Sequence, residues 1–157
     1  MTSNKQRLKI EISECNLCGG AVKLLHPTKA YGSKYKHHSD PESTPGKAIS
    51  FIYRCVKCDA QVWCHWDSTK PFWTLADKKT RDARHQVHLL LDPIWKKEKS
   101  GNYKTWSRGK RRKELYKLLS KHLDIPLDKT HMWMFTIEQC REAYVFFHNY
   151  KVRNNIK

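Results

Sequence analysis

Four of the six cysteines form two C-x-x-C pairs, which is a spacing that binds metal. Cys15 and Cys18 are the first pair, and Cys55 and Cys58 are the second. Each C-x-x-C turn brings two thiolates to one side of a Zn²⁺ ion, which prefers four such ligands in a tetrahedron. The two pairs predict a closed Zn²⁺ site. Its zinc would be structural, because four cysteines leave no coordination position for water.

The two remaining cysteines, and His65 beside one of them, are also possible metal ligands. If residues 61–66 form a strand, Cys64 points toward the core, while Trp63 and His65 point to the opposite face. We interpret Cys64 as a core residue, and the sequence leaves open whether Cys64 or His65 joins the metal site. Cys140 lies on the apolar side of a predicted helix and is expected to be a buried thiol.

The composition indicates a folded protein that attracts polyanions. Of 157 residues, 31 are basic and 15 acidic, which gives a net charge of +16, and six are tryptophans. Such an excess of positive charge makes nucleic acid the first partner to consider. The chain shows no secretory signal and no run of about 18 apolar residues, so we expect a soluble, cytoplasmic protein without membrane association.

Short strands are expected beside the cysteine pairs. Residues 7–12, 21–25 and 48–54 have the composition of strands, and the second and third flank a stretch rich in proline and glycine. We expect a long loop over 26–47. The 36 residues between the two pairs exceed the usual spacing of roughly 15–20 in zinc sites, and this loop accounts for the excess.

The pattern becomes helical after residue 70. Apolar residues recur at helical steps up to Ile94, Thr74 and Asp77 match a capping box at the start, and Pro93 is expected to end or bend the helix. His85 and His88 lie three apart on this helix. We interpret both as surface or boundary residues, because no carboxylate motif accompanies them.

Two more helices are predicted toward the C-terminus. Residues 110–126 form an amphipathic pattern in which Lys113, Lys117 and Lys121 follow one another at steps of four. The third helix opens with Thr136 and Gln139 in a second capping box. The sequence therefore predicts an α+β protein, with an N-terminal zinc ribbon of short antiparallel strands (1–69) packed with a C-terminal three-helix part (70–157) that contains a basic segment (96–121).

Several motifs in this order resemble a family of small zinc-finger-containing proteins of bacteriophages and prophages. They are CNLCGG, CVKCDAQVWCH, KPFWTLADKKTRDARHQVHLLLDPIW and LDIPLDKTHMWMFTIEQC. The resemblance implies a four-cysteine zinc site in a ribbon similar to those of bacterial topoisomerases, whose surfaces can bind single strands. The motif R-x-x-R-x-x-x-H, which is Arg81, Arg84 and His88 here, is part of the resemblance. The chain departs from the family pattern at Trp73 and Trp133, where glycines are usual.

The basic segment and the ribbon supply candidate nucleic-acid contacts. Residues 96–121 contain eleven basic and two acidic side chains, which is more than half of the net charge, and aromatic rings are interleaved with them. Such a mixture can contact phosphates and stack on unpaired bases. We expect sequence-tolerant binding of DNA or RNA, with single strands favoured, by Trp63, His65, Lys104, Trp106, Arg108, Lys110, Arg111, Arg112, Lys113 and Lys117.

Three alternatives to nucleic-acid binding follow from the same features. The basic segment can be only a solvated helix face and linker. The protein can also be a phage factor that docks on a host replication, transcription or defence protein through the same charge. A nuclease of the HNH type would place His37–Pro41 between the cysteine pairs, but no asparagine lies between His38 and Cys55 to orient a general base. We therefore expect a protein that is not an enzyme.

Overall fold

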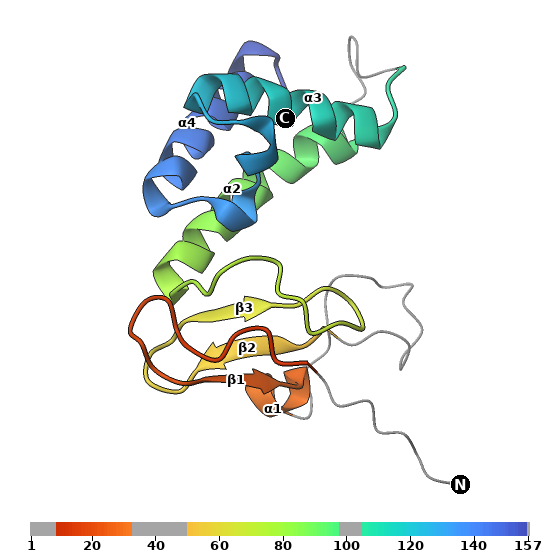
Figure 1. Ribbon diagram of the computed structural model, residues 1–157. Coiled ribbons are helices and arrows are strands. Elements are labelled where there is room, and N and C mark those ends of the chain that lie inside the picture. The colour runs from red at the N-terminus through yellow and green to blue at the C-terminus, as the bar shows by residue number, and fades with distance from the viewer. Residues whose placement is uncertain (1–8, 33–49, 98–104, 157) are drawn as a thin grey trace, which may run out of the picture. The chain divides into compact units, whose positions relative to one another are not determined.

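The computed structural model describes residues 9–32, 50–97 and 105–156. The chain divides into two compact units, Met1–Lys78 and Lys79–Lys157, and each is described by itself. A small antiparallel sheet with a cysteine cluster comes first and helices follow, which confirms the predicted α+β class (Figure 1). The sequence predicted the division after residue 69, but it lies between Lys78 and Lys79, because Pro71 and Ala76 form bridges with Cys64 and Gln61 of the first unit.

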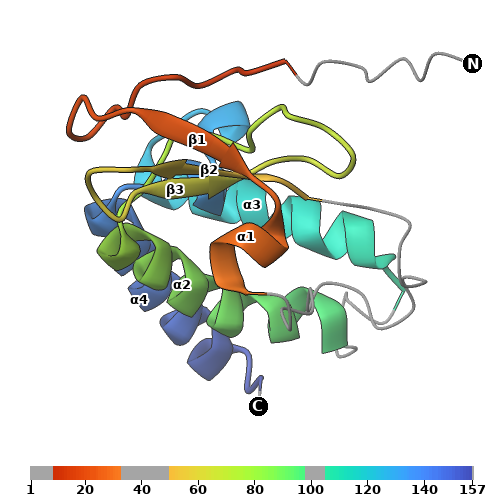
Figure 2. The ribbon, with the colours of Figure 1, turned by 90° about the horizontal axis from the view of Figure 1, so that it is seen from below.

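The first unit contains one sheet of three strands in the order β1-β2-β3. These strands are β1 (Val22–Leu25), β2 (Ile52–Cys55) and β3 (Gln61–Trp63), and neighbours are antiparallel (Figure 2). Val22 pairs with Cys55, so the start of β1 lies beside the second cysteine pair. The strand expected over 7–12 is absent from its described part, residues 9–12.

A short helix interrupts the loop expected over 26–47. Helix α1 (Pro27–Tyr31) begins after His26, whose ring accepts a hydrogen bond from the backbone N–H of Thr28. Pro27 occupies the first helical position. Proline is tolerated there because its missing backbone N–H would have no partner within the helix. The loop prediction is wrong for this turn of helix. Residues 33–49, which include the HHSDP motif, lie outside the described ranges.

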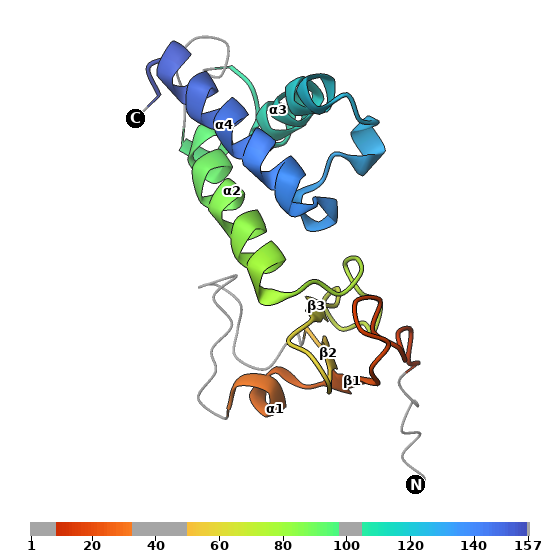
Figure 3. The same cartoon turned by 90° about the vertical axis from the view of Figure 1, so that its left-hand side faces the viewer.

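The second unit consists of helices. Figure 3 shows α4 alongside α2. The elements are α2 (Lys78–Lys97), α3 (Arg108–Leu123), η2 (Leu127–Lys129), η3 (Met132–Met134) and α4 (Ile137–Arg153). Within the described ranges, no helix has the length and apolarity that crossing a bilayer requires.

The helix ends test three predictions. Thr136 and Gln139 form the predicted capping box at the start of α4, since each side chain bonds the backbone of the other residue. The box predicted for Thr74 and Asp77 is wrong, because α2 begins only at Lys78. Pro93 does not end α2 either, because the helix continues for one further turn beyond it, to Lys97.

Each unit has its own apolar core. In the first, Tyr53, Val62, Cys64 and Leu75 pack with the first cysteine of each pair. In the second, α2, α3 and α4 contribute residues that pack around Met132 and Phe135 of the connection between α3 and α4. Cys140 is buried among them, as expected of a core thiol.

Candidate metal centre and basic surface

The two cysteine pairs come together in the first unit. The Sγ atoms of Cys15, Cys18, Cys55 and Cys58 all lie within 4.8 Å of one another. Cys18 Sγ lies 3.5 Å from Cys55 Sγ and 3.4 Å from Cys58 Sγ, and Cys15 Sγ lies 3.7 Å from Cys58 Sγ. A tetrahedron with Zn–S bonds of about 2.3 Å separates its sulfurs by about 3.8 Å. The cluster therefore has the donor set and size of a Zn²⁺ site.

Backbone hydrogen bonds shape both turns. In the first turn, the N–H of Gly19 bonds the carbonyl of Cys15 (2.9 Å), and the N–H of Cys15 bonds the carbonyl of Gly20 (2.8 Å). In the second, the N–H groups of Lys57 and Cys58 point at Cys55 Sγ, at 3.3 and 3.4 Å. Amides aimed at a sulfur stabilise its thiolate form, which is the form that binds metal.

Two glycines permit the close packing of the cluster. Gly19 has φ +66°, a conformation that side chains disfavour. At Gly20, an added Cβ would lie 2.8 Å from Lys57 Cβ and 3.1 Å from Cys55 Sγ. The two turns meet at this point, so the space beside the sulfurs admits only glycine.

The thiols of the second pair have opposite pKa shifts. Burial favours the neutral thiol of Cys55, but the amides of Cys58 and Lys57 outweigh burial and lower the pKa to about 6. The amide of Ala60 lowers the pKa of Cys58, yet burial and the three neighbouring sulfurs raise it to about 12. Without a cation the sulfurs compete for negative charge. A bound Zn²⁺ would hold all four as thiolates and release their protons.

The other sulfur and the histidine near the second pair lie apart from the cluster. Cys64 is fully buried in the first core, and burial raises the pKa of its thiol to about 11. The Ser50 hydroxyl donates a hydrogen bond to its carbonyl (2.6 Å). His65 is exposed and packs its ring on Phe72, with centroids 4.4 Å apart. Neither residue belongs to the group of close metal-binding side chains.

Trp63, a predicted nucleic-acid contact, is half-buried against another ring. It stacks on Tyr31 of α1 with centroids 5.9 Å apart, and Tyr31 in turn lies under the Arg54 guanidinium at 5.1 Å. Arg54 also donates to Gln61 Oε1, and Gln61 donates to the Tyr31 hydroxyl. Sequence reasoning missed Tyr31 and Arg54. Only the pairing of Arg54 with Gln61 across β2 and β3 could have indicated this cluster.

Most of the predicted basic contacts lie on the surface of α3. Those exposed there are Arg108, Lys110, Arg112, Lys113 and Lys117. Trp106, just before the helix, is half-buried, and Lys110 Nζ lies 4.5 Å from the centre of its ring. Lys104 lies outside the described residues. Lys110, Lys113 and Lys117 share one face of α3. Arg112 lies on another face, where its guanidinium is 5.6 Å from the centres of the Trp95 and Tyr116 rings.

Arg111 corrects the predicted set, because its side chain is buried with 5% exposure. It precedes Leu115 and Leu119 by four and eight residues, and both leucines are fully buried in the helical core. Residues at steps of four share a helix face, so this spacing could have excluded Arg111 from the surface. The run of basic residues by itself does not show which of them are buried and which are exposed.

Comparison with known proteins identifies the family. Neither the curated proteins nor the solved structures gave a match to the chain. A protein-family model described as a zinc-finger-containing domain, DUF3268, matches residues 11–150 and so includes both cysteine pairs and all the helices up to Tyr150. The family model matches most of the chain, and the two cysteine pairs come together as a zinc site requires. The chain therefore belongs to this zinc-finger-containing domain family.

Proposed function

We propose that this protein is a nucleic-acid-binding protein whose zinc is structural. The observation that supports this most is a row of four exposed lysines on α3, which are Lys110, Lys113, Lys117 and Lys121. They follow one another at steps of three, four and four residues and therefore share one face of the helix. In all, α3 contains seven basic residues and one acidic residue.

A bound polyanion would stabilise this lysine row more than water does. Like charges at such steps repel one another and destabilise a free helix by a few tenths of a kcal/mol per pair. Glu114 offsets one charge, since its carboxylate pairs with Lys117 Nζ at 2.8 Å. Successive lysines rise by about 5–6 Å along the axis, so each can meet a different phosphate of a strand.

The candidate zinc site fits a structural role and not a catalytic one. All four candidate ligands are cysteines, and a closed set of thiolates holds the sheet without an open position for a substrate. We infer no zinc chemistry beyond folding, and no enzymatic activity.

The resemblance to phage proteins adds two further proposals, that the gene lies in a phage or prophage and that the protein acts in the cytoplasm of its bacterial host. Sequencing the genes beside it tests the first.

Salt dependence of binding tests the proposal. The full chain is titrated into fluorescent single- and double-stranded DNA and RNA at several salt concentrations, and anisotropy gives the affinity. For nucleic acid, log affinity should fall linearly with log salt. The double variant Lys113→Gln/Lys121→Gln should reduce that slope by about 2, because each lost phosphate contact removes about 1.

A matched variant separates position from net charge. Lys79→Gln/Lys129→Gln removes two exposed lysines of the same unit that lie outside α3. It should keep the slope within about 0.5 of the wild type, on the same scale of one unit per contact. Equal effects of the two double variants would contradict a role for the lysine row. If no nucleic acid binds at low salt and an acidic protein does, the docking-factor alternative replaces the proposal.

A further inference from the structure

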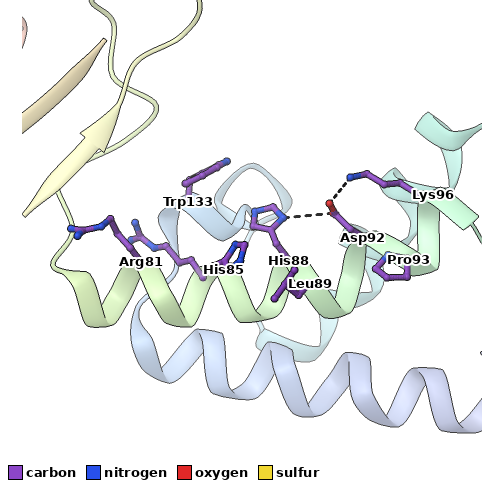
Figure 4. A pocket seen from close by; sticks show the side chains of 9 residues that line it. Arg81, His85, His88, Leu89, Asp92, Pro93, Lys96 and Trp133 are labelled. Atoms are coloured by element: carbon purple, nitrogen blue, oxygen red, sulfur yellow. Dashed lines mark hydrogen bonds and ion pairs between the residues drawn. The ribbon is translucent and has the colours of Figure 1, made fainter. Parts of the chain in front are cut away.

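A cavity of about 470 Å³ lies beside α2 in the helical unit, and none of the features above uses it. Its volume is within the range of small-molecule sites. Figure 4 shows Arg81, His88 and Asp92 on the side of α2 that faces Trp133. One face of the helix thus supplies charged groups and η3 supplies an aromatic ring.

The Trp133 ring gives the cavity an apolar, planar wall. Its centre lies 5.6 Å from the centre of the His88 ring. Leu89, which is 55% exposed, and Pro93 extend the apolar lining. Flat heterocycles stack on such walls, and any of the nucleobases can do so, because each has a π-face.

Positive charge dominates the lining. Arg81, Arg84 and Lys96 line the cavity together with a single acidic residue, Asp92. Lys96 Nζ lies 2.5 Å from Asp92 Oδ2, so that carboxylate is already paired within the protein. Arg84 is 8% exposed, and its Nε donates to the carbonyl of Phe135 at 3.0 Å, which fixes its guanidinium in place. An anionic group is the ligand that this charge attracts.

His88 adds a polar group that lies between the Trp133 ring and Asp92 (Figure 4). Its Nδ1 lies 3.7 Å from Asp92 Oδ1, while its Nε2 is buried and has no hydrogen-bond partner in the described part of the chain. Burial, and to a smaller extent the charge of Arg112, lowers the pKa of His88 although Asp92 raises it. A buried polar atom without a partner requires an explanation, and a ligand that reorders this wall is one.

We propose that this cavity binds one unpaired nucleotide, with its base against Trp133 and its phosphate toward Arg81 and Arg84. The class of ligand rests on the proposed nucleic-acid function, whereas the shape, ring and charge of the cavity are independent of it. The lysine row on α3 then holds the strand without regard to sequence, and the cavity selects strands that can present an unstacked base.

Calorimetry with the whole 157-residue chain, loaded with zinc, tests the cavity directly. The probes are adenosine 5′-monophosphate, adenosine and inorganic phosphate at low salt. The monophosphate should bind saturably and at least about tenfold more tightly than either part, because only it engages both the ring and the arginines. Absence of saturable binding of the monophosphate would overturn the proposal.

Two variants and two controls locate the binding. Trp133→Leu should weaken the monophosphate about tenfold, as loss of one stacked base does. Arg81→Gln should weaken the monophosphate about tenfold and leave adenosine unchanged, and it serves even if the tryptophan variant fails to fold. Trp73→Leu and Arg141→Gln change the same residue types at positions that do not line the cavity, and both should bind like the wild type. Equal binding by all four variants would refute the site.

Oligonucleotide binding distinguishes this inference from the proposed function. If strands bind through α3 but Arg81→Gln and Trp133→Leu bind both strands and monophosphate like the wild type, the cavity inference fails and the proposed function stands. If the monophosphate binds in the cavity and no strand binds at low salt, the cavity inference stands and the proposed function fails. If both hold, the two variants should also weaken single strands more than duplexes.

Discussion

At the scale of single residues, the candidate zinc site depends on a glycine as well as on its cysteines. The C-x-x-C spacing predicted all four cysteines, because the ligand geometry of such turns is local. Nothing local identified Gly20, whose neighbours Lys57 and Cys55 come from the other turn. A contact between two distant turns becomes visible only when both are folded.

Gly20→Ala should therefore weaken zinc binding. Its Cβ would come within 3.1 Å of Cys55 Sγ and 2.8 Å of Lys57 Cβ, so the two turns must move apart. We expect the affinity for Zn²⁺ to fall by at least about tenfold, comparable to losses of groups that support metal ligands. Competition with a chromogenic chelator measures this.

Gly109→Ala is the matched control. An added Cβ at Gly109 meets nothing within 4 Å, and this glycine lies in the other unit at the start of α3. Zinc affinity should be unchanged in this variant. If Gly20→Ala also bound zinc like the wild type, the close approach of the turns would not constrain the site.

At the scale of elements, local signals predicted which segments are helical better than they predicted where the helices begin and end. The capping box of α4 was predicted because its two residues bond each other within one turn. The start of α2 was not, because Ala76, next to the proposed cap, pairs with Gln61 of the sheet. Pro93 lies within α2 because the helical core holds Leu91 and Ile94 on either side of it. Long-range packing decided both outcomes.

The packing of α2, α3 and η3 around two histidines should make the helical unit sensitive to acid. Burial first, then the charge of Arg112, lowers the pKa of His131 from its ordinary value of 6.5, and burial lowers that of His88. His131 stacks on Tyr116 of α3, with centroids 5.8 Å apart. The unfolded chain then binds more protons than the folded one below about pH 6.5. Stability is full above this pH and is lost as pH falls through the lowered pKa values.

Urea unfolding at about pH 7.5 and pH 5.5, followed by circular dichroism, measures this loss. His131→Asn keeps an acceptor for the backbone N–H of Trp133 but cannot titrate, so it should lose less stability between the two pH values. His148→Asn changes an exposed histidine of α4 and should behave like the wild type. Any effect of acid on the cysteine cluster is common to all three proteins. An equal loss in all of them would exclude His131 as a source of the acid sensitivity.

At the scale of the whole molecule, two cores imply two responses to metal removal. Cys15 and Cys55 belong to the core of the first unit, whereas the core of the second unit lies in Lys79–Lys157 and contains no candidate zinc ligand. Composition and cysteine spacing predicted this sheet-then-helix order. They could not place the boundary, since the pairing of residues 70–76 with the sheet leaves no compositional signal.

Chelation should thus unfold the sheet and spare the helices. Structural zinc contributes folding free energy outright in small metal-stapled units. With a strong chelator, amide hydrogen exchange should speed up across β1, β2 and β3, while α2, α3 and α4 keep their protection. Adding Zn²⁺ back should restore the sheet. A verified metal-free sample with full protection in the sheet, or loss of both units together, would contradict this view.

The paired turns also mean that the metal would act as a reversible cross-link within the chain. Cys15 and Cys18 precede β1, and Cys55 and Cys58 lie at and after the end of β2, so the ion and the β1–β2 ladder join the same two segments. Peptide continuity between Cys18 and Cys55 is then not required to hold the two strands together. A chain cut once in that interval should remain one particle until its zinc is removed.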